Sequence, residues 1–570
     1  MRLSISKSKN ATSLHVIKST YENGIHSSKV VENLGTVEEL NKKLDGRDPI
    51  EWAREYITKL NEEEKLNKRE VLVKYSPVKI IDKGQQRLFN GGYLFLQKIY
   101  HELKLDKMCR AIAKKYKFSY DLDSILSRLV YGRVIYPSSK LSTYQLSSRF
   151  MEQPLFDLHQ IYRALEIIAK EADFIQASLY SNSLAVSKRN TRVLYYDCTN
   201  YFFEIEQESG IKQYGYSKEH RPNPIVQMGL FMDGDGVPLA VYIGKGNTNE
   251  QLTLKPLEKK ILSDFNCSKF IVCTDAGLAS NSNRQFNNQG ERAFITTQSV
   301  KKLKKHLKEW ALSPEGWRLS NDSSIYSLDK LDENNDFERT FYKERWIVED
   351  GLEQKLIVSF SLKYRNYQRK VRNGQIERAR KVLNTDLGKL KKVNQNDYKR
   401  FIKKTSVTPA GEVASKAVYE IDNSVIRKEE AFDGFYAVCT NLDGEAAAVL
   451  MVNRRRWQIE ECFRIMKSEF RARPVYLSRD DRITAHFIIC FIALVVYRLL
   501  EKKLGGQYTC SEIVQGLRDM NFYEVKGEGF VPTYMRTDFT DSLHDVFGFR
   551  TDYQILPMRQ MKKIFKATKS

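Results

Sequence analysis

Two aspartates follow short apolar runs that have the character of buried β-strands. Asp197 comes directly after the run 193–196, and Asp275 ends the run that starts at Phe270. A carboxylate beside such runs is costly to bury unless it is paired or binds a metal, and strand ends in an open sheet are where ligand sites form. An Asp in this position can also simply begin a turn. Two such residues indicate a candidate site that needs a third group.

A third carboxylate, Glu460, lies in a segment with helical periodicity. At about 100° per residue, one apolar stripe contains Ile459, Cys462, Phe463, Met466 and Phe470. Immediately beside this stripe lie Asn453, Arg456, Glu460, Arg464 and Lys467. The pattern places Glu460 at the edge of the buried face between cations, and it points Glu461 toward water. An ordinary amphipathic helix with Arg–Glu pairs one turn apart has the same pattern.

Three carboxylates together fit phosphoryl-transfer chemistry. Two divalent ions about 4 Å apart need shared and separate oxygen ligands, and Mg²⁺ prefers carboxylates, water and phosphate oxygens. One ion activates the attacking water or hydroxyl, and the other stabilises the leaving oxygen. Arg456 and Lys467 would then hold phosphates beside the ions. For Trp457, next to Arg456, stacking on DNA is possible, but packing against a neighbouring element is favoured.

The elements around these residues predict a mixed α/β sheet. Apolar runs at 226–232 and 239–243 flank the Gly-rich turn 233–236, which predicts an antiparallel hairpin. A helix is expected at 256–263 and a further strand at Phe294-Ile295. The apolar run Phe487–Tyr497 is too short for a bilayer, which needs about 20 residues, and it predicts a buried helix within 482–502.

The flanking regions differ in pattern. Short alternating runs around Glu22-Asn23-Gly24 predict a hairpin, and helical periodicity dominates from about 85 to 190. A long basic helix is expected near 375–392 and strand character at 405–422, in a segment that interrupts the core. The expected divisions are an N-terminal hairpin and helical region at 1–80, a helical, DNA-binding region at 81–190, the catalytic core at 191–300 and 431–502, an insertion at 301–430, and a C-terminal tail at 503–570.

Charge and composition narrow the class of protein. There are 93 Lys and Arg against 71 Asp and Glu, a net charge of +22, and residues 361–400 alone hold 13 against 3. Nucleic acid is the leading partner for such a charge, although each basic stretch could be a solvated helix face. A hydrophobic content of 42% excludes a disordered chain. The eight cysteines form no C-x-x-C pair, which disfavours zinc ribbons and disulfide scaffolds. The N-terminus MRLSISKSKN has no following apolar segment, so we expect no secretory signal.

Four motifs carry a resemblance to a known family. They are Tyr196-Asp197-Cys198-Thr199, the loop Gly244–Glu250, Thr274-Asp275-Ala276-Gly277, and the spacing Arg456-x3-Glu460-x6-Lys467. The helix starting at Ala485 is also similar to the family's closing helix. On these residues the chain resembles the DDE transposases of bacterial insertion sequences, in particular the insertion-sequence-four superfamily and its branch with a large insertion before the last acid. The family's tyrosine, which contacts DNA near the active site, is replaced here by Asn453.

The resemblance implies a fold and an activity. The fold would be α/β, with a ribonuclease-H-like mixed-sheet catalytic core and a largely β insertion, preceded by a helical DNA-binding region. Asp197, Asp275 and Glu460 would be the catalytic residues and the ligands of two Mg²⁺ ions, for which Mn²⁺ can substitute. Asn453, Arg456, Arg464 and Lys467 would contact DNA. The protein would act as a homodimer on the terminal inverted repeats of its own element, cut the ends, with or without a DNA hairpin, and join the freed 3′-OH to target DNA. Such a protein would work in the prokaryotic cytoplasm at the nucleoid, with no membrane partner.

Two other functions fit the same residues. One is a transposase-derived DNA-binding protein or repressor without catalysis, although all three acids are intact. The other is a ribonuclease-H-like nuclease that cuts DNA but does not join it.

Overall fold

The chain folds into two compact units. The computed structural model describes residues 1–570 except 9–10, 23–24, 45, 68–70, 72, 74, 321, 384–396 and 408–412. The first unit comprises residues 1–88, 522–533 and 551–564, and the second comprises 89–521, 534–550 and 565–570. The candidate catalytic residues all belong to the second unit.

The first unit begins with a three-stranded antiparallel sheet in the order β1-β2-β3. Its elements are β1 (Arg2–Lys7), β2 (Thr12–Glu22), β3 (Ile25–Thr36), α1 (Val37–Lys43) and α2 (Pro49–Asn67). Leu14, Leu40 and Ala53 bury their side chains together between strand and helices. The pairing of β2 with β3 confirms the predicted hairpin, whereas Asn23 and Gly24 at its turn lie outside the described residues.

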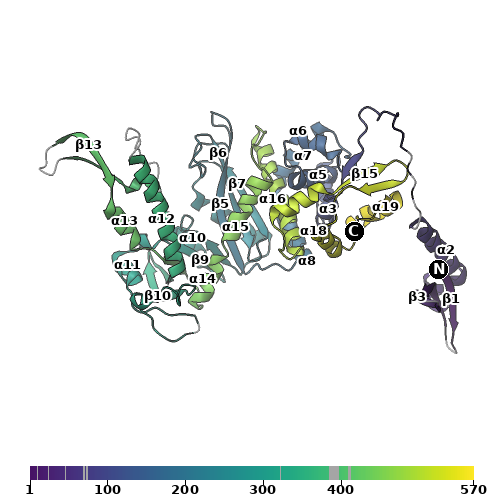
Figure 1. Ribbon diagram of the computed structural model, residues 1–570, viewed down its shortest axis with the longest axis horizontal. Coiled ribbons are helices and arrows are strands. Elements are labelled where there is room, and N and C mark those ends of the chain that lie inside the picture. Colours follow the sequence, from purple (N-terminus) through teal and green to yellow (C-terminus); the bar gives the residue numbers. More distant parts are fainter. Residues whose placement is uncertain are drawn as a thin grey trace. The chain divides into compact units, whose positions relative to one another are not determined.

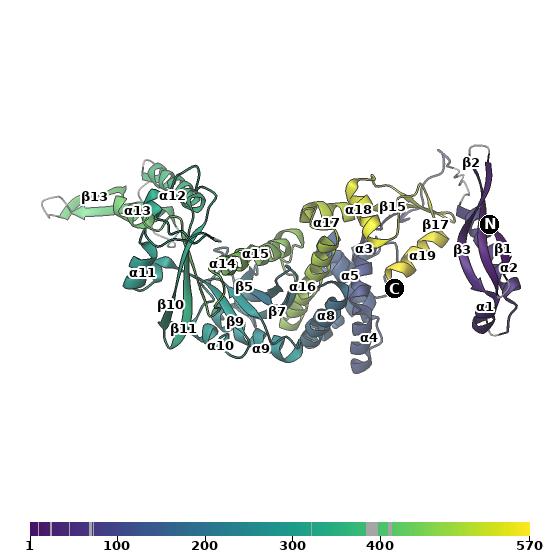
Figure 2. The same ribbon diagram turned by 90° about the horizontal axis from the view of Figure 1, so that it is seen from below.

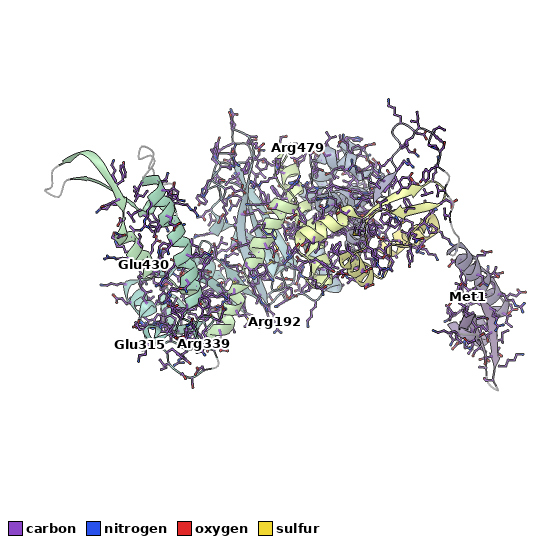
Figure 3. All side chains as sticks on the ribbon, viewed as in Figure 1. Met1, Arg192, Glu315, Arg339, Glu430 and Arg479 are labelled. Atoms are coloured by element: carbon purple, nitrogen blue, oxygen red, sulfur yellow. The ribbon has the colours of Figure 1, made fainter. Side chains whose placement is uncertain are left out.

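The second unit opens with helices, as predicted. They are α3 (Tyr93–Glu102), α4 (Leu105–Tyr116), α5 (Leu122–Ile135), α6 (Lys140–Ser147), α7 (Leu158–Lys170) and α8 (Ala172–Val186). The helix α5 is buried on all sides, which explains why its sequence is apolar without a clear polar face. These helices pack on α16 (Asp480–Lys503) of the core. Arg479, labelled in Figure 3, precedes α16 and lies 3.0 Å from Glu166 of α7.

An eight-stranded mixed sheet forms the centre of the second unit, in the order β10-β11-β14-β9-β8-β5-β6-β7. The core strands are β5 (Val193–Phe202), β6 (Ile225–Asp233), β7 (Pro238–Lys245), β8 (Ile271–Thr274) and β9 (Ala293–Gln298). β5, β6 and β7 are antiparallel neighbours, while β8 is parallel to both β5 and β9. Three antiparallel strands followed by two parallel ones form a ribonuclease-H-like core. The predicted hairpin and the strand at Phe294-Ile295 are confirmed.

Helices cover both faces of this sheet (Figure 2). On one side, α9 (Leu254–Asp264) packs on Leu194, Tyr196 and Val272. On the other side lie α14 (Ala446–Arg454), α15 (Trp457–Arg464) and α16, close to β5 in Figure 1 as well. Alternation along β5 sends successive side chains to opposite faces, so one face packs on α9 and the other faces the helices that carry the third acid.

The apolar run Phe487–Tyr497 lies inside α16, and the prediction of a buried helix is confirmed. By length and composition alone α16 could cross a membrane, but 94% of its most apolar window is buried within the protein. The eight cysteines are all free thiols with buried side chains.

The interrupting segment, residues 301–430, mixes strands and helices. It contributes α11 (Lys305–Leu312), β10 (Phe341–Glu349), β11 (Leu352–Phe360), α12 (Leu362–Leu383), β12 (Ile402–Val407), β13 (Val413–Ile421) and α13 (Asn423–Glu430), whose last residue is labelled in Figure 3. β11 pairs with β14 (Phe435–Thr440), so β10 and β11 extend the central sheet. The expected basic helix at 375–392 begins earlier, at Leu362. Within it, Arg372 forms a bidentate pair with Asp433 at 2.6 Å. Its expected end lies outside the described residues.

The segment expected as a tail, residues 503–570, is folded. It contains α17 (Cys510–Asp519), β15 (Asn521–Val525), β16 (Gly529–Pro532), α18 (Asp538–Phe547), β17 (Leu556–Pro557) and α19 (Met558–Thr568). α17 belongs to the second unit and packs on α5.

Candidate active site

The two aspartates lie at neighbouring parallel strands, but only Asp275 is at a strand end. Asp275 directly follows β8, whereas Asp197, expected at the end of its strand, is the fifth residue of β5, which continues to Phe202. The register pairs Val193 with Ile271 and Tyr195 with Cys273. Asp197 and Asp275 each lie two residues beyond the last of these pairs. The pairing of β5 with β8 therefore brings these residues near each other, and the charge of Asp275 acts on Asp197.

The face of the sheet that carries them is covered by α14 and α15. The Tyr195 hydroxyl donates to the Val452 carbonyl at 2.8 Å, and the Cys273 thiol donates to Oδ1 of Asn453 at 3.5 Å. Side chains two residues apart on a strand share a face, so Asp197 points to the same side as Tyr195. α15 packs directly against β5.

Each aspartate also makes a local backbone contact. Oδ1 of Asp197 accepts from the Cys198 N–H at 2.7 Å, and Oδ1 of Asp275 accepts from the Leu278 N–H at 3.0 Å. The second contact is the turn-initiating role that an Asp at a strand end often has. It engages one oxygen of the carboxylate and is therefore compatible with metal binding through the other.

The electrostatics of Asp197 reflect an acidic pair in a confined site. Burial raises the pKa of Asp197 to about 6, and the negative charge of Asp275 adds to the increase. Lys218 and, less strongly, Arg456 oppose it. Two hard oxygen donors that repel each other fit a divalent cation, since the cation would relieve both the repulsion and the burial cost.

The third acid, Glu460, lies on the right helix, but its carboxylate is turned elsewhere. Its Oε1 is 3.7 Å from Nη2 of Arg456, and its side chain is 60% exposed. Across the described part of the chain, the triad is not among the groups of acids, His and Cys whose ligand atoms all lie within 4.8 Å of one another. Arg456, which also acts on Asp197, therefore connects the acid pair to Glu460.

The expected exposures of Glu460 and Glu461 are reversed in the structure. The Glu461 side chain is 25% exposed, less than that of Glu460. The prediction assumed one regular helix from Asn453 to Lys467. Instead, a turn at 455–456 separates α14 from α15, and residues Ile465–Glu469 widen into a π-helix, so the angular positions along the segment shift. The predicted apolar stripe is nevertheless confirmed, because its five residues are all buried.

Glu460 faces a cavity of about 650 Å³ between α15 and the interrupting segment. The lining includes Asn453, Arg456, Trp457 and Glu460, together with Tyr364 and Tyr367 of α12. Trp457 is 57% exposed, so the favoured packing against a neighbouring element, if it occurs here, leaves more than half of its surface open. Trp457 stays open because it lines the wall of this cavity.

Lys467 and Arg464, both expected at DNA, have different surroundings. The Lys467 ammonium lies 3.2 Å from Glu219 and over the Tyr201 ring, with 19% of its side chain exposed. Burial lowers the pKa of Lys467, an effect that Glu219 opposes. Arg464 is 56% exposed and pairs with Glu461 at 3.1 Å.

Asn453, in the place of the family's tyrosine, is buried. Its amide Nδ2 donates to the Tyr436 hydroxyl at 2.6 Å, and its Oδ1 accepts from Cys273. It thereby joins α14 to β14 and β8 directly beneath the acid pair. A DNA contact for Asn453 stays a prediction.

Two charged residues at the site were missed by the sequence reasoning. Lys218 and Glu219 lie in the loop between β5 and β6, where the charge of Lys218 acts on Asp197 and Glu219 pairs with Lys467. The loop is long and mixed in charge, and no spacing rule singles them out. Glu250, the last residue of the motif Gly244–Glu250, pairs with Lys218 at 3.2 Å.

Comparison with known proteins identifies a family. The family described as Transposase DDE domain matches residues 201–496, a range that starts just after Asp197 and contains Asp275 and Glu460. No curated protein matches the chain. Among solved structures, the chain is similar to the cryo-EM structure of the piggyBac transposase synaptic complex with hairpin DNA, with 8% identity over 75% of this chain and 78% of that chain and a TM-score of 0.35.

Proposed function

Because the chain belongs to the Transposase DDE domain family, we propose that it binds the terminal inverted repeats of its own insertion sequence, cuts the DNA there, and joins the freed 3′-OH to target DNA. The observation that carries this proposal is the acid pair Asp197 and Asp275 at the parallel strands β5 and β8, with the helix of Glu460 packed against β5. An acid pair on adjacent strands with a third acid on the covering helix is suited to metal-dependent phosphoryl transfer.

Asp197, Asp275 and Glu460 would hold the divalent ions, with Mg²⁺ the expected metal, Mn²⁺ its substitute, and two ions the expected number. When bound, such ions activate the attacking oxygen and stabilise the leaving oxygen. For the third acid to take part, Glu460 must leave Arg456, and its exposed side chain has room to turn.

The cations of the site have distinct tasks in this proposal. Arg456 would exchange its partner Glu460 for a DNA phosphate as the acid moves to the metal, which keeps a positive charge where negative charge develops. Lys467 would hold a neighbouring phosphate after releasing Glu219. Arg464, already exposed, would contact the DNA backbone without rearrangement.

We further propose that two copies act together, one at each end of the element, in the cytoplasm of a prokaryotic cell. Cutting both ends in one complex links excision to insertion. The basic helix α12, which lines the cavity at Glu460, would add sequence-independent contacts to the DNA backbone.

The test uses the purified chain, Mg²⁺ and a duplex carrying the repeats that flank its gene. We expect cleavage at the repeat ends, and we expect Asp197→Asn, Asp275→Asn and Glu460→Gln each to abolish it while DNA binding persists. Glu461→Gln, one residue along the same helix, is the matched control and should cleave normally. Retained cleavage in an Asp variant would remove that residue from the site.

A strand-transfer assay with excised ends separates the related functions. Joined products support a transposase, whereas cut but unjoined ends indicate a nuclease. Binding without cutting by the unaltered chain indicates a repressor.

A further inference from the structure

We propose that Lys218 is a further catalytic residue, which donates a hydrogen bond to the DNA phosphate that is cut. The inference rests on the proposed function, and it adds a group from outside the three acids and the cations Arg456, Arg464 and Lys467. Its basis is where the loop between β5 and β6 places one ammonium.

The Lys218 ammonium lies at the wall of the acid site. Its Nζ donates to the carbonyl oxygen of Cys198, the residue after Asp197, and lies 3.2 Å from Oε1 of Glu250. Among the charged groups that act on Asp197, Lys218 has the largest effect, ahead of Asp275 and Arg456. A phosphate held at the acid pair would therefore meet this cation.

The loop holds Lys218 in place through the same strand that carries Asp197. Oδ1 of the buried Asn200, on β5, accepts from the Lys218 backbone N–H at 3.2 Å. Nδ2 of Asn200 donates to the Tyr216 carbonyl at 2.9 Å. A fixed backbone means that little ordering is needed when substrate arrives.

The far end of the side chain is fixed as well. Oε1 of Glu250 accepts from Nε2 of Gln227 at 2.9 Å, so the partner of Lys218 is itself held by β6. An ammonium has three donors, and the Cys198 carbonyl and Glu250 engage two of them among the described residues. With 33% of the side chain exposed, the third donor can reach a ligand.

Lys467 offers an instructive contrast. Its partner Glu219 also pairs with Arg473, burial lowers its pKa, and its side chain is 19% exposed, less than that of Lys218. Lys218 can bind phosphate and keep both of its contacts. This difference makes Lys218 the cation that is ready at the acid pair before DNA arrives.

The experiment is a double-substitution cycle between protein and DNA. Binding of a repeat-end duplex is measured by fluorescence anisotropy with Ca²⁺ in place of Mg²⁺, so that the DNA stays uncut. The phosphate at the cleavage position is either natural or a neutral methylphosphonate, and the protein is unaltered or Lys218→Met. We expect each single change to weaken binding about tenfold, the scale of a charge-assisted hydrogen bond, and the double change to weaken it little further.

Controls separate contact from general charge. Lys269, at the opposite end of β8 and paired with Glu291 at 2.5 Å, gives the matched variant Lys269→Met, for which the methylphosphonate should keep its full penalty. In Lys218→Arg, which keeps the charge, the methylphosphonate should also keep its full penalty. Where Lys218→Met does not fold, Lys218→Gln replaces it with the same expected result.

Penalties that multiply in the double change, to about a hundredfold, would overturn the assignment of Lys218 and leave the proposed function intact. A chain that does not bind repeat-end DNA at all would overturn the proposed function, and this inference with it.

Discussion

The acid pair on the sheet and the acid on the helix show two ways of building one site. Asp197 and Asp275 are brought together by strand register, which the backbone hydrogen bonds of β5 and β8 fix. The position of the Glu460 carboxylate depends on how α15 packs and on which group its side chain pairs with. In this structure it pairs with Arg456. The pair is therefore preorganised, whereas in the proposed function the third acid would complete the site by a side-chain movement.

The largest expected effect tests whether all three acids share one task. Asp197→Asn, Asp275→Asn and Glu460→Gln should each lower the rate of repeat-end cleavage by about a thousandfold or more, as loss of a group that stabilises transition-state charge does. Single-turnover cleavage with Mg²⁺ measures it. If Glu460→Gln cuts at more than a tenth of the normal rate, Glu460 does not share the catalytic task of the two aspartates.

The next effect concerns how much the ionised Asp197 lowers the stability of the folded protein. The folded pKa of Asp197, about 6, lies above the ordinary value of 3.8. The folded state therefore binds the proton more tightly, and stability falls as pH rises from about 4 to 6. Without metal, Asp197→Asn should be more stable than the unaltered chain by about 2–3 kcal/mol at pH 7, with the difference vanishing near pH 4.

Chemical denaturation in EDTA at both pH values measures this difference. Glu461→Gln should leave stability within about 0.5 kcal/mol of the unaltered chain, as surface substitutions do. Equal gains at pH 4 and pH 7 would show that the ionisation of Asp197 is not the cause.

Metal affinity sharpens the comparison further. Asp197→Asn should weaken Mn²⁺ binding to the DNA-free protein roughly tenfold or more, a scale common for changes at metal sites. Glu460→Gln should change it by less, because Glu460 is paired with Arg456 before the metal binds. Titration followed by Mn²⁺ electron paramagnetic resonance gives both values. Similar losses in the two variants would mean that Glu460 joins the metal without DNA.

The smallest expected effect concerns Lys467, which is paired with Glu219 before DNA binds. Glu219→Gln frees Lys467 and Arg473 from their shared partner, so DNA affinity should rise about threefold at low salt, and the gain should fade as salt increases. Anisotropy titrations across salt concentrations measure it. Glu291→Gln, which frees the exposed Lys269, serves as the control, and a loss of affinity in Glu219→Gln would show that Glu219 supports DNA binding.

The sheet half of the site could be predicted because local sequence determines it. Apolar runs before Asp197 and Asp275 indicate buried strands of a mixed sheet, although β5 continues past Asp197 to Phe202. The buried apolar stripe from Ile459 to Phe470 could be predicted from the sequence in the same way. Periodicity reports which residues face the core, and both predictions depend on nothing else.

The helix half resisted prediction because its determinants are not local. The turn at 455–456 and the π-helix at Ile465–Glu469 shift the angular positions, and the cavity that exposes Trp457 and Glu460 is formed with residues about a hundred positions earlier. Lys218 was missed for a similar reason, since only the folded loop brings it to Cys198 and Glu250.

A crystal structure of the chain with repeat-end DNA and Mn²⁺, with the metal located by anomalous scattering, tests the central claim most directly. The account predicts Mn²⁺ bound by Asp197 and Asp275, with the Glu460 carboxylate turned from Arg456 to the metal. Mn²⁺ bound away from the two aspartates, or Glu460 still paired with Arg456 while the DNA is in place, would contradict it.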